Sequence, residues 1–216
     1  MKTLLFDLDG TLTDPSRGIL NCIEYSLEKL AVQPVSREVL YGCIGPPLRR
    51  VFAELLTTGD QSLIEEGVRL YRERFSESGL FENELYPGIE NLLENFNTHG
   101  YTLFVATSKP EVYARRILDH FEIMHYFEAL YGPDLKGRLE DKRLLVKKLL
   151  ADHNCRIDRT CMIGDRKYDI EAGRFNNIKT CGVTYGFGSL AELEDCGSDL
   201  ICHGVDQLFE VIGKLF

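Results

Sequence analysis

Short apolar runs and longer helical stripes alternate along most of the chain. The apolar runs are bounded by glycine or by polar residues, which is typical of short buried strands. These strands are expected at residues 2–6, 101–106, 127–131, 161–163, 180–183 and 200–201. Helices are expected to begin near residues 89, 110, 141, 169, 189 and 205. The alternation predicts an α/β fold, a Rossmann-like parallel sheet with helices on both of its faces.

The segment from residue 15 to residue 82 departs from this alternation. Its apolar residues recur at helical spacing, beginning with Ile19, Ile23 and Leu27, and no strand pattern interrupts them. An all-helical stretch directly after the first strand indicates an insertion. We therefore expect a helical cap domain at residues 15–82 and a core domain made of residues 1–14 and 83–216.

Two local signals predict where helices begin. Asp14 is expected to be the N-cap of the first helix of the cap, with Pro15 in its first helical position. Residues 189–192 have the Ser-x-x-Glu pattern of a capping box, in which each side chain bonds the backbone of the other residue. We expect a further helix to start there.

Composition and charge narrow the classes of partner. The chain has 216 residues, 44% of them hydrophobic and 27% charged, as in an ordinary globular protein. Its net charge is −9, and nucleic acids and anionic membranes bind concentrated Lys and Arg. We therefore expect neither as a main partner. A small phosphorylated metabolite is compatible with this charge, because a local positive cluster or a metal ion is enough to bind it.

Cysteine usage and apolar run lengths bear on the cellular compartment. The seven cysteines are odd in number and lack the close spacing of zinc or redox motifs, so we expect reduced thiols. The apolar start ends at Asp7, far short of a signal-peptide core. No apolar run approaches the roughly 20 residues that span a bilayer. The sequence predicts a cytoplasmic protein that is not in a membrane.

Polar residues with related chemistry follow several of the predicted strands. In an open parallel sheet, ligands bind at the carboxyl ends of the strands. The residues at these positions are Asp7 and Asp9, Thr107 and Ser108, Lys142, and Asp165 and Asp169. Two carboxylates as close as Asp7 and Asp9 repel each other, so a cation or a shared proton is expected between them. Hydroxyl and N–H groups before a helix, as at residues 107–109, offer an anion site.

These residues resemble the motifs of the haloacid dehalogenase superfamily of phosphohydrolases. The family pattern is Asp-x-Asp-Gly-Thr, a Thr or Ser after the next core strand, an isolated Lys, and Gly-Asp-x-x-x-Asp. The chain has Asp7-Leu8-Asp9-Gly10-Thr11, then Thr107, Lys142 and Gly164-Asp165-Arg166-Lys167-Tyr168-Asp169, in that order. The resemblance covers essentially the whole chain. Residues 85–88, 107–110 and 182–189 look most like its phosphoglycolate phosphatase-like branch.

The resemblance implies a role for each matching residue. Asp7 would attack phosphorus and form an aspartyl phosphate, and Asp9 would act as general acid and then as general base. Mg²⁺ would be bound by Asp7, the backbone carbonyl of Asp9 and Asp165, with Asp169 acting through water. The phosphoryl oxygens would be bound by Thr107, the Ser108 N–H and Lys142.

Several assignments stay open at this level. Lys136 competes with Lys142 for the phosphoryl group, and Asp169 could be a plain helix N-cap. Arg49 and Arg50 in the cap either contact a second anionic group of the substrate or belong to a solvated helix face. The sequence is compatible with either a monomer or a homodimer.

The leading interpretation is a magnesium-dependent phosphatase of a small phosphorylated metabolite, such as a phosphoglycolate-like phosphomonoester. A phosphomutase similar to β-phosphoglucomutase and a 5'-nucleotidase are alternatives with the same fold. A protein that accepts a phosphoryl group without turnover, like a response-regulator receiver, is a more distant one, because receivers lack the acid/base Asp9 and the cap.

Overall fold

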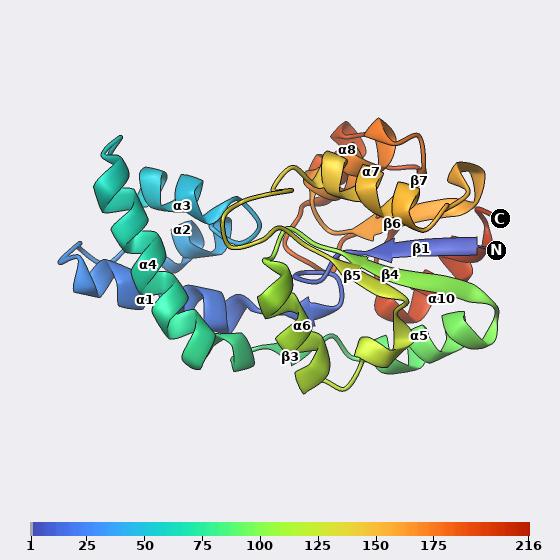
Figure 1. The fold of residues 1–216 in the computed structure, drawn as a ribbon, viewed down its shortest axis with the longest axis horizontal. Helices are drawn as coiled ribbons and strands as arrows, with labels where there is room; N and C mark the ends of the chain where they lie inside the picture. The colour runs from blue at the N-terminus through green and yellow to red at the C-terminus, as the bar shows by residue number, and fades with distance from the viewer. Residues whose placement is uncertain (1) are drawn as a thin grey trace. The chain divides into compact units, whose positions relative to one another are not determined.

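The computed structural model describes residues 2–216, and the chain divides into two compact units (Figure 1). The first is Met1–Asp14 with Leu85–Phe216, and the second is Pro15–Glu84. Two short strands, β2 (Thr13–Asp14) and β3 (Glu84–Leu85), pair with each other where the chain passes between the units.

The first unit contains a six-stranded sheet in which all neighbouring strands are parallel. In spatial order the strands are β5 (Ala129–Tyr131), β4 (Tyr101–Ala106), β1 (Lys2–Phe6), β6 (Thr160–Gly164), β7 (Lys179–Val183) and β8 (Leu200–Cys202). The central strands are almost entirely apolar because they are buried on both faces. This is the α/β Rossmann-like sheet that the alternating pattern predicts.

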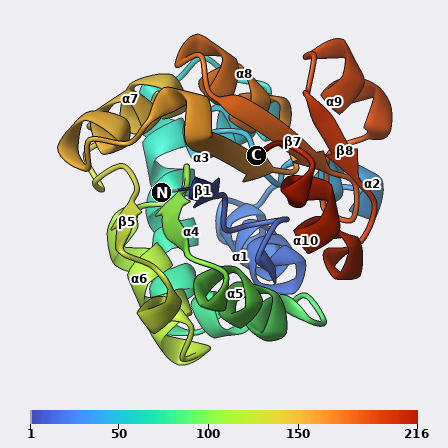
Figure 2. The same cartoon turned by 90° about the vertical axis from the view of Figure 1, so that its right-hand side faces the viewer.

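Helices cover both faces of this sheet, as the view along the strands shows (Figure 2). One face packs on α7 (Lys142–Asp152) and α8 (Lys167–Phe175), through a cluster that includes Leu5, Phe104 and Met162. The other face carries α5 (Ile89–Thr98) and α10 (Val205–Gly213), where aromatic rings meet. The remaining helices are α6 (Glu111–His120) and α9 (Leu190–Asp195).

The strand register brings three strand ends to the same level. Phe6 on β1 lies opposite Val105 on β4 and opposite Ile163 on β6. The residues just beyond these strands therefore emerge side by side at one edge of the sheet. Those residues are Asp7 after β1, Thr107 after β4 and Asp165 after β6.

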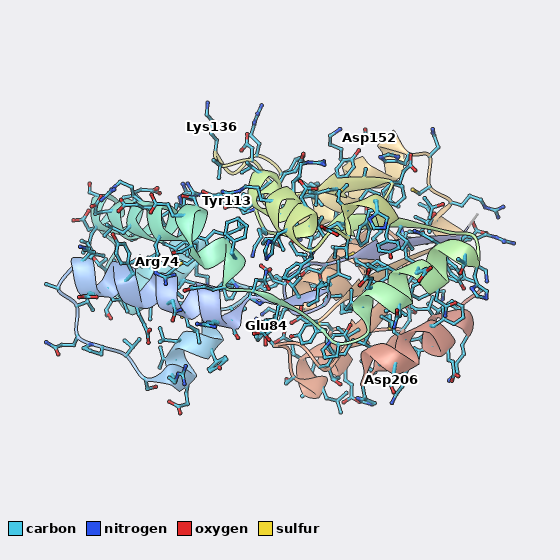
Figure 3. All side chains as sticks on the ribbon, turned by 90° about the horizontal axis from the view of Figure 1, so that it is seen from below. Arg74, Glu84, Tyr113, Lys136, Asp152 and Asp206 are labelled. Atoms are coloured by element: carbon cyan, nitrogen blue, oxygen red, sulfur yellow. The ribbon has the colours of Figure 1, made fainter. Side chains whose placement is uncertain are left out.

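The second unit contains four helices and one short 3₁₀ turn. They are α1 (Ser16–Lys29), α2 (Arg37–Gly42), α3 (Leu48–Leu55), α4 (Gln61–Glu77) and the turn η1 (Gly79–Phe81). Gly18 on α1 lies against η1 so closely that a Cβ on it would overlap the Gly79 carbonyl. Arg74, labelled in Figure 3, pairs with Glu82 at 2.8 Å, and Asn21 donates a hydrogen bond to the same carboxylate.

Three local predictions need correction. Asp14 does not cap the first cap helix, because it belongs to β2; the Gly18 N–H in that helix's first turn is instead bonded by the Glu82 carbonyl at 2.9 Å. The strand expected at residues 127–131 begins only at Ala129, since Phe127 follows a 3₁₀ turn and points its ring at Phe6. The helix expected from residue 169 begins at Lys167.

No helix within residues 2–216 has the length and apolar character that a membrane crossing requires.

Candidate active site

Asp7 stands at the end of β1 with its carboxylate held from two sides. Its backbone N–H donates to the Ile163 carbonyl at 2.9 Å, which continues the pairing of β1 with β6. Its Oδ1 accepts from the Leu8 N–H at 2.8 Å and lies 2.9 Å from Nζ of Lys142. The carboxylate is therefore fixed in direction at the edge of the sheet.

Lys142, the first residue of α7, joins two of the predicted acids. Besides Asp7, its ammonium group contacts Oδ1 of Asp169 at 2.5 Å, and the lysine side chain is only 4% exposed. Burial alone lowers the pKa of Lys142, but the charges of Asp169 and Asp7 raise it above its ordinary value. The buried ammonium group is therefore protonated. The competing Lys136 is exposed, and its side chain extends outward from its loop (Figure 3).

Asp169 lies in the first turn of α8 and is fully buried. It is not the N-cap, which is Arg166; instead its Oδ2 accepts from the Arg166 N–H at 3.0 Å while the Asp169 N–H donates to the Arg166 carbonyl. Burial raises the pKa of Asp169, and the ion pair with Lys142 limits that rise. One oxygen of this carboxylate thus orders the start of the helix and the other faces Lys142.

Asp165, which follows β6, is fully buried, and only one of its two carboxylate oxygens accepts a hydrogen bond within residues 2–216. Its Oδ2 accepts from the Phe187 N–H at 2.8 Å, whereas its Oδ1 is buried without a hydrogen-bond partner among residues 2–216. Burial, together with the nearby Asp169 and Asp7, raises the pKa of Asp165 to about 8. A buried carboxylate oxygen without a partner is costly, and a bound cation would remove that cost.

Two glycines allow the chain to approach Asp165 closely. Gly10 has a left-handed backbone with φ of +81°, and a Cβ there would overlap the Asp165 carboxylate. A Cβ on Gly186 would overlap the same side chain and the carbonyl oxygen of Gly10. The loop at residues 184–188, which supplies the Phe187 N–H, therefore lies directly against the Asp7–Thr11 turn.

Three acids are close enough to share one metal ion. Asp7, Asp165 and Asp169 each place a carboxylate oxygen within 4.8 Å of the others. Carboxylate oxygens are the ligands that Mg²⁺ prefers. At full ionisation four acids, these three and Asp9, face the two lysines Lys142 and Lys109, which leaves two negative charges. The donor set, the unpartnered oxygen of Asp165 and this charge balance all fit a divalent cation.

Asp9 is paired with a lysine that the sequence argument passed over. Nζ of Lys109 lies 2.7 Å from Oδ1 and 2.6 Å from Oδ2 of Asp9. Burial raises the pKa of Asp9, and Lys109 opposes that rise. Lys109 lies two residues after Thr107, and no feature of sequence spacing separates it from the other lysines in this half of the chain.

Thr107 and Ser108 follow β4 beside these acids. Thr107 is buried, and its Oγ1 accepts a hydrogen bond from the Lys109 N–H at 3.2 Å. A hydroxyl that accepts a backbone N–H keeps its own proton to donate. Ser108 is exposed at the same turn, before α6. The turn thus presents donors to an anion at the edge of the sheet.

Arg49 and Arg50, the two arginines left open between substrate contact and a solvated helix face, lie in the second unit. Arg49 contacts Glu65 at 2.6 Å, and Arg50 contacts Glu54 at 2.8 Å. All four side chains are well exposed.

The chain is similar to known proteins over most of its length. The profile of a family described as "Haloacid dehalogenase-like hydrolase" matches residues 4–183. A protein of Pseudomonas aeruginosa named 5'-nucleotidase is 43% identical over 97% of this chain and 94% of its own length. A protein of Mycobacterium tuberculosis named tyrosine-protein kinase PtkA is 33% identical over 98% of this chain and 72% of its own.

A more distant relative and a solved structure are similar over most of the chain as well. A phosphoglycolate phosphatase of Aquifex aeolicus is 29% identical over 88% of each chain. A crystal structure described as a predicted phosphatase from Clostridium acetobutylicum is 40% identical, with a TM-score of 0.93 over 99% of this chain and 98% of that one. The similarity therefore extends over both units of the chain.

Proposed function

The chain belongs to the haloacid dehalogenase-like hydrolase family, and we propose that it is a Mg²⁺-dependent phosphatase of small phosphomonoesters that works through an aspartyl phosphate on Asp7. The family and the names of its phosphatase relatives make it a phosphoric monoester hydrolase. The metal, the roles of individual residues and the substrate are the parts that we propose.

The observation that carries the proposal is the group of three buried acids at one strand edge. Within this group Asp165 has a buried oxygen that accepts no hydrogen bond in residues 2–216. Lys142 contacts Asp7, another member of the group. A phosphate dianion cannot approach a carboxylate unless positive charge offsets both. This group of acids supports a site where a cation and a lysine supply that charge together.

Asp7 is the proposed nucleophile. Its Oδ1 already accepts the Leu8 N–H and faces Lys142, so we assign the attack to Oδ2. The new bond joins Oδ2 to phosphorus, and the bond from phosphorus to the leaving oxygen breaks. Splitting hydrolysis into formation and cleavage of an acyl phosphate replaces one difficult step with two easier ones.

Asp9 is the proposed acid and base. It gives a proton to the leaving oxygen in the first step and takes one from water in the second, when water attacks phosphorus and releases Asp7. Its place two residues after the nucleophile, on the same turn, allows it to serve both steps. The cycle ends with both carboxyl groups in their starting states.

The phosphoryl oxygens have three proposed donors on this edge. Lys142 provides a fixed positive charge, and Thr107 keeps a hydroxyl proton to donate because its oxygen already accepts the Lys109 N–H. The Ser108 N–H completes the set. Positioning and electrostatic stabilisation account for most of the catalysis of phosphoryl transfer.

We propose that Mg²⁺ would be held by Asp7, the Asp9 carbonyl and Asp165. Asp169 would act on the ion through a bound water, and its ion pair with Lys142 holds its carboxylate in place. When bound, the ion supplies positive charge against the phosphate and orients its oxygens.

Nucleoside 5'-monophosphates are the first substrate class to test. The relative that is 43% identical is named 5'-nucleotidase, whereas the phosphoglycolate phosphatase of Aquifex aeolicus is 29% identical. Phosphoglycolate and other small phosphomonoesters form the second class.

Phosphate release from a panel of nucleotides and phosphometabolites, with and without Mg²⁺, tests the proposal. We expect release that needs Mg²⁺ and that Asp7→Asn lowers by at least about 1,000-fold, because the nucleophile is lost. Near-normal turnover by folded Asp7→Asn would sink the mechanism. A stable phosphoryl group on Asp7, or its transfer to another acceptor without free phosphate, would contradict hydrolysis.

A further inference from the structure

Lys109 makes a two-point contact with the proposed acid and base. Its ammonium nitrogen reaches both oxygens of Asp9, at 2.7 Å and 2.6 Å. The Lys109 side chain is 6% exposed and that of Asp9 is 20% exposed. A lysine buried to this extent cannot be a solvated surface charge, and it fixes the direction in which the Asp9 carboxylate points.

The two buried lysines contact three of the four acids, and they share none of them. Lys142 contacts Asp7 and Asp169, which belong to the group that could hold a metal, whereas Lys109 contacts Asp9. The Asp9 carboxylate is not in that group, although it lies only two residues from Asp7 on the same turn. A carboxylate this close to a divalent cation would be drawn to it unless another positive charge held it.

The backbone around Lys109 is firmly placed. Its N–H donates to Thr107 Oγ1 at 3.2 Å, which ties the lysine to the end of β4. On the other side, a Cβ on Gly132 would overlap the Lys109 carbonyl, so the segment after β5 packs directly against it. The backbone at residues 107–109 is therefore held in place, and the Lys109 side chain extends from it to Asp9 in the turn after β1.

We propose that Lys109 is a positioning residue that holds the Asp9 carboxylate apart from the metal-binding acids and keeps it available for proton transfer. The inference rests on the proposed function. The transferred proton moves from the Asp9 carboxyl group to the leaving oxygen, and later from water to Asp9.

Lys109→Met tests this through the choice of leaving group. An alkyl phosphate needs a proton on its leaving oxygen, and p-nitrophenyl phosphate does not. We expect kcat/KM to fall by about 100-fold for the alkyl phosphate and by less than about 10-fold for the nitrophenyl ester, as for a mispositioned general acid. Lys109→Arg, which keeps the charge, should recover part of the lost alkyl activity. Lys147→Met, an exposed lysine on α7, is the control.

Mg²⁺ binding gives a second readout that does not depend on turnover. With Lys109 gone, Asp9 is free to join the other acids, so calorimetry should show tighter Mg²⁺ binding by about threefold or more. Equal losses on both substrates with unchanged Mg²⁺ binding would overturn the inference. If Lys109→Met does not fold, Lys109→Gln takes its place in both measurements. Failure of the wild type to hydrolyse any phosphomonoester would reject the proposed function instead.

Discussion

One ion pair from each unit shows how much burial can differ at a similar contact distance. Lys142 and Asp169, in the first unit, lie 2.5 Å apart with side chains 4% and 0% exposed. Arg50 and Glu54, in the helical unit, lie 2.8 Å apart with side chains 62% and 63% exposed. Similar contacts therefore sit in very different surroundings, and a contact distance alone says little about what a pair contributes.

The difference lies in what remains when one partner is removed. At the exposed pair, water solvates the remaining charge, so such pairs contribute about 0–1 kcal/mol. At the buried pair, the remaining charge has no solvent, and losing one partner costs about 3–5 kcal/mol. By the same reasoning, the buried charges would act strongly on a phosphate at the proposed site. The following substitutions alter either the buried acids and lysines or charges exposed to solvent.

Lys142→Met should have the largest effect. It leaves Asp7 and Asp169 facing each other without the ammonium group that contacts both of them. We expect kcat to fall by at least about 100-fold, as when a main oxyanion donor is lost. The free energy of unfolding, measured with urea in metal-free buffer, should fall by about 3 kcal/mol.

Lys136→Met separates this effect from a general loss of positive charge. Lys136 is exposed on its loop, so its removal should leave kcat and stability nearly unchanged. If Lys136→Met lost the activity and Lys142→Met kept it, the assignment of the phosphoryl-binding lysine would have to be exchanged.

The convergence of the candidate site residues could be predicted from the sequence because it depends on strand order and strand ends. Apolar runs identify β1, β4 and β6, and parallel neighbours bring Asp7, Thr107 and Asp165 to one edge. That conclusion requires only the order and the ends of the strands, not the conformation of any side chain.

The partners of the two buried lysines could not be predicted in the same way. A lysine side chain is long and flexible, so which acid it meets depends on backbone details such as the Thr107–Lys109 turn. The Phe187 N–H that holds Asp165 is a backbone group, which no residue type reveals. The prediction of Asp14 as an N-cap was wrong because Asp14 belongs to β2. The Glu82 carbonyl accepts the Gly18 N–H in the first turn of that helix instead.

Gly186→Ala should have an intermediate effect, seen most directly in metal binding. The added methyl group would overlap the Gly10 carbonyl and the Asp165 side chain, so it should push Asp165 from its place beside Asp7. We expect Mg²⁺ binding, measured by calorimetry, to weaken by about 10-fold, or about 1.4 kcal/mol. Gly213→Ala is the matched control, because a Cβ there meets nothing within 4 Å. Equal Mg²⁺ affinity in the two variants would show that loop 184–188 does not position Asp165.

Arg49 and Arg50 should have the smallest effect on stability. A double-mutant cycle with Arg49→Gln and Glu65→Gln measures the coupling of one exposed pair directly, and we expect about 0.5 kcal/mol because both side chains are solvated. The same variants test the remaining expectation about substrate. If an arginine binds a second anionic group, Arg49→Gln or Arg50→Gln should raise KM for an anionic substrate while kcat and stability stay unchanged. A coupling of several kcal/mol at Arg49 would contradict the comparison, since an exposed pair would then behave like a buried one.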